Sequence, residues 1–162
     1  MTQQRWFRVG TLLALLAVTL VGCGSSPATP TNTVTGPAQT TTEFYTWYLT
    51  TDRDSGSPMV SQAYYNRPEL APAMVATADA SLAAYKQDGF DPFLCSKEVP
   101  DGMSAGQPQI SGSRATVPVI LVWNPGTSSE AKTTLTAHLV RTDVIWQITA
   151  IDCPTSPGTA TK

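Results

Sequence analysis

The stretch Ala115-Thr-Val-Pro-Val-Ile-Leu-Val-Trp123 decides the fold, because its side chains alternate with a period of two, as they do along a β-strand. Asn124-Pro-Gly126 follows it as a strong turn signal. The same alternation returns in Leu135-Thr-Ala-His-Leu-Val140 and in Trp146-Gln-Ile-Thr-Ala-Ile151. Residues 107–110 add a short fourth candidate. These segments predict antiparallel strands joined in sequence order.

Several residues refine the expected sheet. Pro118 has no N–H to donate, which predicts an edge or a bulge at this point. Thr142-Asp143 lacks the glycine that a tight hairpin prefers, so a slightly longer loop is expected. Asp101-Gly102 and Ser104-Ala-Gly106 are expected to form turns.

Helical periodicity precedes the strands. Thr40–Glu43 is typical of a helix start, and a first helix follows with an inward face made of Phe44, Trp47, Tyr48 and Thr51. Residues 59–65 predict a short helix that breaks at Arg67-Pro68, and a third helix is expected from Pro72 to Gly89. The plan is therefore α+β, in the order α-α-α-β-β-β-β, with the helices packed on one face of a curved antiparallel sheet.

The first residues have the composition of a secretory signal. Arg5 and Arg8 are the only charges before Glu43, and an apolar run from Thr11 to Val21 follows them. A membrane-spanning helix needs about 20 apolar residues. The run is shorter than this, so residues 1–22 are expected to be a signal peptide.

The run ends in Leu20-Val-Gly-Cys23, which resembles the lipobox of bacterial lipoprotein precursors. The resemblance implies cleavage before Cys23 and a diacylglyceryl thioether on its thiol. The alternative is an ordinary signal peptide with an unrelated cysteine. Two or more acyl chains give stable membrane anchoring, so a lipidated Cys23 would hold the protein on the membrane surface.

Residues 23–41 are expected to form a flexible tether. They contain no charge and no aromatic residue, and are rich in Thr, Pro and Ser. Glycosylation of these threonines is an alternative to a plain spacer. The globular domain is placed at 42–154, a size that supports a hydrophobic core, and residues 155–162 are expected to be a disordered tail.

Charge limits the possible partners. The net charge of −2 includes Arg5 and Arg8, so signal cleavage would bring it to about −4. The remaining Lys and Arg residues are scattered, which disfavours nucleic-acid binding. The expected partners are membrane lipid through Cys23, and an envelope protein or a small ligand. The expected location is the outer side of the cytoplasmic membrane or the outer membrane.

Two cysteines remain in the domain, Cys95 and Cys153. An oxidising compartment outside the cytoplasm favours a disulfide between them. It would close a loop of about 58 residues, which the chain-entropy model values at about 4 kcal/mol. A metal site is the rival interpretation, but one His and two Cys are few ligands, and no metal is expected.

Four segments carry a resemblance to a known family. They are Phe44-Tyr-x-Trp-Tyr-Leu49, Arg67-Pro-Glu-Leu70, Asp91-Pro-Phe-Leu-Cys95 with Val99-Pro100, and Trp146-x-Ile-x-x-Ile-x-Cys153. In this order they resemble an uncharacterised exported family of the nuclear transport factor two-like (cystatin-like) superfamily. The resemblance implies a cone of helices against a bent sheet and a partner for the first cysteine, but no reaction.

No catalytic set emerges from the sequence, and no cofactor is expected. His138 is the only histidine, and it is interpreted as a half-exposed strand residue in preference to a catalytic base. Asp88 and Asp91 are interpreted as turn caps in preference to an acid–base pair. The serines lie in loops without a nucleophile elbow. The domain is therefore expected not to be an enzyme.

Aromatic side chains offer a possible pocket at the open end of the cone. Its candidate residues are Tyr45, Tyr48, Tyr64, Trp123 and His138, although most of the tyrosines are equally expected in the core. The resulting hypothesis is a membrane-anchored lipoprotein that displays a non-catalytic binding domain. The alternative is a small-molecule carrier or enzyme that uses the cone pocket.

Overall fold

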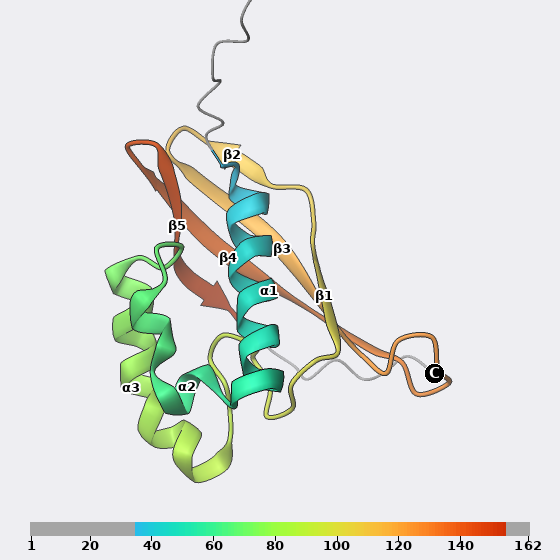
Figure 1. Ribbon diagram of the computed structural model, residues 1–162. Coiled ribbons are helices and arrows are strands. Elements are labelled where there is room, and N and C mark those ends of the chain that lie inside the picture. Colours follow the sequence, from blue (N-terminus) through green and yellow to red (C-terminus); the bar gives the residue numbers. More distant parts are fainter. Residues whose placement is uncertain (1–34, 155–162) are drawn as a thin grey trace, which may run out of the picture. The chain divides into compact units, whose positions relative to one another are not determined.

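A computed structural model describes residues 35–154, in which helices precede strands (Figure 1). The helical elements are α1 (Pro37–Ser55), α2 (Pro58–Ser61), the 3-10 helix η1 (Ala63–Asn66) and α3 (Pro72–Asp88). The strands are β1 (Gly102–Ala105), β2 (Gln109–Ser111), β3 (Arg114–Trp123), β4 (Ala131–Thr142) and β5 (Ile145–Asp152). The α+β class is confirmed. Five strands are present in this part of the chain where four are expected, because residues 102–105, which the sequence predicts to form turns, pair with β3 as β1.

The sheet is antiparallel and is built around β3. Its order is β1-β3-β4-β5, and β2 also pairs with β3. The β3–β4 ladder runs from Arg114↔Val140 to Trp123↔Ala131. On the other side of β3, β2 covers residues 114–116 and β1 covers residues 119–122. The two short strands thus share one side of the central strand.

Pro118 lies at the junction between these two short strands. Gly106 N donates a hydrogen bond of 2.7 Å to Pro118 O on this side, and β1 ends just before it, at Ala105. A proline cannot donate to a neighbouring strand. The expected edge or bulge is therefore corrected, because β3 is a central strand and Pro118 lies where its pairing passes from β2 to β1.

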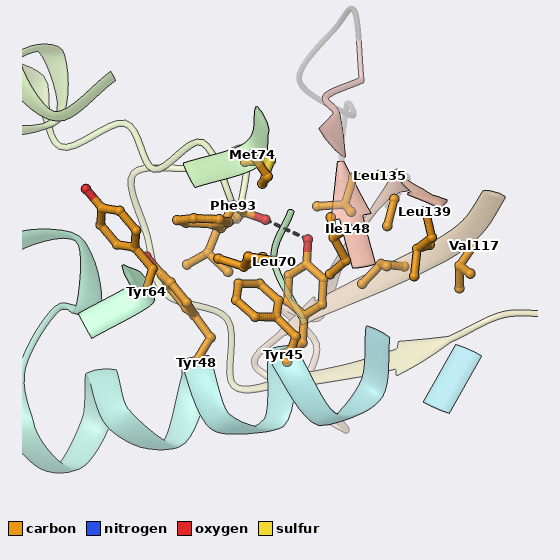
Figure 2. Packing of buried hydrophobic residues seen from close by; sticks show 14 of the residues in the cluster. Tyr45, Tyr48, Tyr64, Leu70, Met74, Phe93, Val117, Leu135, Leu139 and Ile148 are labelled. Carbon is orange, nitrogen blue, oxygen red and sulfur yellow. Dashed lines mark hydrogen bonds between the residues drawn. The ribbon is translucent and has the colours of Figure 1, made fainter. Parts of the chain in front are cut away.

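The helices cover one face of the sheet and leave the other open (Figure 1). From Ala115 to Leu121, the positions of β3 that face the helices are at most 4% exposed, and they alternate with partly exposed positions. In β4, the core positions are Leu135, Ala137 and Leu139, as the alternation predicted. Figure 2 shows Tyr45 and Tyr48 extending from α1 toward Phe93, so aromatic rings fill the space between helices and sheet.

Helix α1 begins earlier than the sequence suggested. Pro37 occupies the first turn and Gly36 is the N-cap, without a side-chain cap. Thr41 and Thr42 lie inside the helix, where their hydroxyls donate to Pro37 O and Ala38 O. The expected hydroxyl caps at residues 40–42 are thus corrected. The part of the expected tether from Pro37 onward belongs to the folded domain.

Two turns also differ from expectation, for the same physical reason. The helix expected over 59–65 is split, because Gln62 adopts the left-handed conformation with φ 56°. The β4–β5 connection is a tight two-residue turn, since Thr142 pairs with Ile145 and Asp143 has φ 55°. Asp tolerates this conformation without glycine. Gly89, with φ 76°, ends α3 as predicted.

Candidate interaction surface

The open face of the sheet carries a hollow of about 570 Å³ near β2. Its lining side chains come from neighbouring strands, because the register places residues of β2, β3 and β4 side by side. One row is Gln109, Thr116 and His138, and the next is Ser111, Arg114 and Val140. These positions alternate with the core positions, so they face away from the helices.

A β-bulge shapes the hollow. The β4–β5 register shifts between His138 and Leu139, which leaves Thr149 as the extra residue of β5. Thr149 Oγ1 donates a hydrogen bond of 3.1 Å to His138 O, and Thr149 also lines the hollow. Bulges bend the strand that carries them and re-aim side chains. The irregularity therefore lies where the open face is hollowed.

The charges at the hollow are few and specific. His138 Nε2 lies 2.6 Å from Asp152 Oδ2, across β4 and β5. Arg114 is exposed and forms no ion pair with any residue of the described range. Arg114 therefore adds to this surface a positive charge that has no ion-pair partner among the described residues.

The expected cone pocket is corrected, because three of its five residues belong to the core. Tyr45, Tyr48 and Tyr64 have no exposed surface. Tyr45 donates to Phe93 O at 2.8 Å, a bond drawn in Figure 2. Burial raises the pKa of the Tyr45 and Tyr48 hydroxyls, so both stay protonated hydrogen-bond donors. His138 is on the opposite side of the sheet and is not brought together with them.

Trp123 lies in a third place, beside the disulfide. It lines a hollow of about 350 Å³ together with Phe90, Thr133 and both cysteines. Its indole Nε1 is buried and has no hydrogen-bond partner among the described residues. The five predicted pocket residues therefore divide among the core, the open face and this second hollow.

The disulfide between Cys95 and Cys153 is confirmed, with Cα atoms 5.4 Å apart. Cys95 lies in the segment between α3 and β1, and Cys153 directly follows β5. The disulfide thus links the segment that connects α3 with β1 to the end of the last strand, β5. Both thiols are used in this bond, which rules out the rival metal interpretation for them.

Asp88 and Asp91 act as caps, as predicted. The exposed Asp88 accepts from Phe90 N at 2.9 Å. Asp91 is 5% exposed, and its Oδ1 accepts from Phe93 N and Leu94 N at 2.8 and 3.2 Å. Burial raises the pKa of the Asp91 carboxyl to about 6, and hydrogen bonds from Tyr48, Phe93 and Leu94 oppose this rise. The two carboxyls are not buried together.

No protein-family model and no curated protein matches the sequence. Solved structures do match. A chain of the native type VI effector–immunity complex Tae3–Tai3 from Ralstonia pickettii has a TM-score of 0.56 at 22% identity, over 76% of this chain and 98% of that chain. The selenomethionine form of the complex gives a TM-score of 0.53 at 20% identity, over 75% and 99% of the two chains. At these identities the likeness shows the fold alone.

The sequence reasoning identified His138 but missed its neighbours. Gln109, Ser111, Arg114 and Thr116 enter the hollow only through the strand register, although the alternation of β3 already placed Thr116 on the outward face. The expected signal peptide and Cys23 lie outside the described residues. Within the described range, no helix is long and apolar enough to span a membrane.

Proposed function

We propose that this protein is an exported lipoprotein of the bacterial envelope, and that its domain binds another protein without catalysing a reaction. The observation that carries the proposal is the open sheet face. The helices cover one face, while the other presents a hollow of about 570 Å³ to solvent. A hollowed surface with a few convergent polar groups is the default form of a binding site.

The composition of the open face suits a protein partner. Pro118, Ile120 and Val122 of β3 are partly buried there, and Thr134 and Thr136 of β4 lie beside them. Protein interfaces combine apolar area with polar groups in about this way, and charged residues are depleted from their centre. The open face therefore offers contact area as well as the polar groups of the hollow.

The similar solved structures support a role in protein recognition. The matching chain was crystallised in a complex between an effector and its immunity protein. A comparable role for this chain, as one member of a recognition pair in the envelope, is part of the proposal. Its helical layer on an antiparallel sheet is also compatible with the proposed kinship to the nuclear transport factor two-like superfamily.

Export and anchoring form the second part of the proposal. The Cys95–Cys153 disulfide supports export, because such bonds persist in oxidising compartments. Cys23, in its lipobox-like context, supplies the proposed attachment site. Without the lipid, the protein would leave the membrane surface.

The anchor is tested by replacing its thiol. In the host bacterium fed labelled palmitate, the Cys23→Ala variant is expected to lose the label and to leave the membrane fraction. The double variant Cys95→Ser with Cys153→Ser is the control and should keep the label. A Cys23→Ala protein that still carries the label would refute lipid attachment at Cys23 and would leave the proposed binding function unaffected.

Binding through the open face is tested by photo-cross-linking in intact cells. A photoreactive residue at Thr134, which is exposed on β4, should give an adduct with one other polypeptide. The control position is Val60 on α2, which is 59% exposed on the helical side. Adducts from Val60 alone, or none from Thr134, would overturn the proposal.

The alternative is a small-molecule carrier or enzyme, and the His138–Asp152 pair in the hollow is the observation that favours it. A histidine oriented by a carboxylate is a common general base. No hydroxyl or thiol of the described residues hydrogen-bonds to its ring, so a nucleophile is missing from the geometry. A thermal-shift screen of small metabolites would support this alternative if a stabilising compound lost its effect in His138→Ala.

A further inference from the structure

The two edges of the sheet differ in how they are protected. Beside β5 runs the segment before α3, where Leu70 forms a parallel bridge with Ile148. Ala71 N donates to Ile148 O at 2.9 Å, and Ile148 N donates to Glu69 O at 2.7 Å. The opposite edge is formed by β1 and β2. No strand of residues 35–154 pairs with their outer side.

The open edge is made of two short strands, but it lacks the charged side chains that protect many sheet edges. Exposed strand edges are normally protected by short length, charged side chains, prolines or bulges, because their free N–H and C=O groups can pair with a further strand. Residues 102–113 contain no charged side chain, and Pro108 lies outside both strands. All three residues of β2 are exposed, and Ile110 is 57% exposed. This edge is therefore free to pair.

The hollow adjoins the same strand. Gln109 and Ser111 of β2 form its rim, and Thr116 and Arg114 stand beside them on β3. A strand added to β2 would place every second side chain on the face that carries the hollow. The uncompensated charge of Arg114 favours a carboxylate in that position.

We propose that β2 binds an extended segment of a partner protein as an additional strand, with an acidic side chain directed toward Arg114. Main-chain hydrogen bonds would supply affinity and the hollow would supply specificity, as in other cases of strand addition. The inference rests on the proposed binding function and identifies its partner. A second copy of this chain fits less well, because residues 102–113 offer no carboxylate to Arg114.

The test uses NMR on the full chain carrying Cys23→Ser, which keeps it free of lipid. The probe is the peptide Thr-Val-Thr-Val-Glu-Val-Thr-Val-Thr, whose hydroxyls and carboxylate share one face. This glutamate peptide should change the amide chemical shifts of Gln109, Ile110 and Ser111. It should also bind at least tenfold more tightly than the same peptide with lysine in place of the central glutamate. A peptide N-methylated at the alternate residues whose N–H groups face β2 should lose binding, because that edge can no longer donate main-chain hydrogen bonds.

Two arginine variants provide the matched comparison. Arg114→Glu should reverse the preference, so that the lysine peptide binds more tightly. Arg141→Glu should leave the preference unchanged, because Arg141 is on the next strand but lies over the Trp146 ring on the helix-covered face.

Four results would overturn the strand-addition proposal. The first three are chemical-shift changes that map to the helices, equal affinity for the two peptides, and no binding of either peptide. The fourth is that the outward-facing amides of β2 are already protected from hydrogen exchange in the absence of peptide. The last would mean that another part of the chain or a second copy covers the edge. An adduct from Thr134 together with any of these results would preserve the binding function and exclude only its use of β2.

Discussion

The phenolic hydroxyl of Tyr48 on α1 donates a hydrogen bond of 2.5 Å to Oδ2 of Asp91 inside the hydrophobic core. The same carboxyl accepts two backbone amides of the turn that leads to Cys95. Asp91 N donates to Ser96 O across this turn at 2.8 Å. One buried carboxyl thus joins the first helix to the turn that carries the disulfide.

Stability should rise as the pH falls toward 4. Burial raises the pKa of Asp91 from 3.8 to about 6, so the folded state binds its proton more tightly than the unfolded chain does. The contribution, about 3 kcal/mol, is fully present below pH 3.8 and is lost as the pH rises through 6. Urea unfolding of wild type and Asp91→Asn from pH 4 to 7 measures it. If both proteins show the same pH dependence, Asp91 is not its source.

Tyr48→Phe should destabilise the domain at pH 7 by about 1.5–3 kcal/mol, the usual range for a hydrogen bond to a charged group. Tyr45→Phe is the matched control on the same helix, because Tyr45 donates to the neutral carbonyl of Phe93. Its loss should cost about 0.5–1.5 kcal/mol. Both values come from urea denaturation. A cost for Tyr45→Phe that equals or exceeds that for Tyr48→Phe contradicts an ionised Asp91.

Removing the disulfide by Cys95→Ser with Cys153→Ser should lower the free energy of unfolding by about 2–5 kcal/mol, through greater entropy of the unfolded chain. Denaturation of the oxidised wild type and the double variant gives the difference. Mass spectrometry of non-reduced protein from the native envelope should show the Cys95–Cys153 cross-link. Two free thiols in that sample would refute the bond.

Gly89→Ala should destabilise the domain by about 1–2 kcal/mol, because φ 76° is strained for a residue with a Cβ. No heavy atom lies within 4 Å of an added Cβ, so the cost comes from backbone conformation alone. Gly102→Ala is the control, since it also has free space but no positive φ. Thermal unfolding compares the variants, and equal melting temperatures would exclude strain at Gly89.

Local patterns were sufficient for the long elements. Period-two alternation predicted which residues of β4 face the core, and it also holds along β3 from Ala115 to Leu121 and for Trp146 and Ile148 of β5, because burial on one face requires it. It failed at the end of β5, where Ala150 is exposed and Ile151 packs against the core after the bulge. Pro72 and Gly89 marked both ends of α3, since each fits one helix end. The disulfide followed from two cysteines in an exported domain.

The short elements could not be predicted from the sequence, because they form through pairing with strands that are distant in the chain. β1 has four residues and reads as turns, yet it pairs with residues 119–122 of β3. Gln62 adopts a left-handed backbone conformation, which could not be predicted because glutamine does not favour it. The bulge beside His138 likewise depends on how β4 and β5 pair.

The sequence by itself determined that this is an α+β domain with one buried sheet face and one linking disulfide, because periodicity and composition express burial directly. Only the tertiary structure decided the use of each aromatic or polar residue. Tyr45 and Tyr48 became core residues because Phe93 and Asp91, more than 40 residues away, accept their hydroxyl hydrogen bonds. Gln109, Thr116 and His138 became one surface because strand register, which no local pattern encodes, aligned three strands.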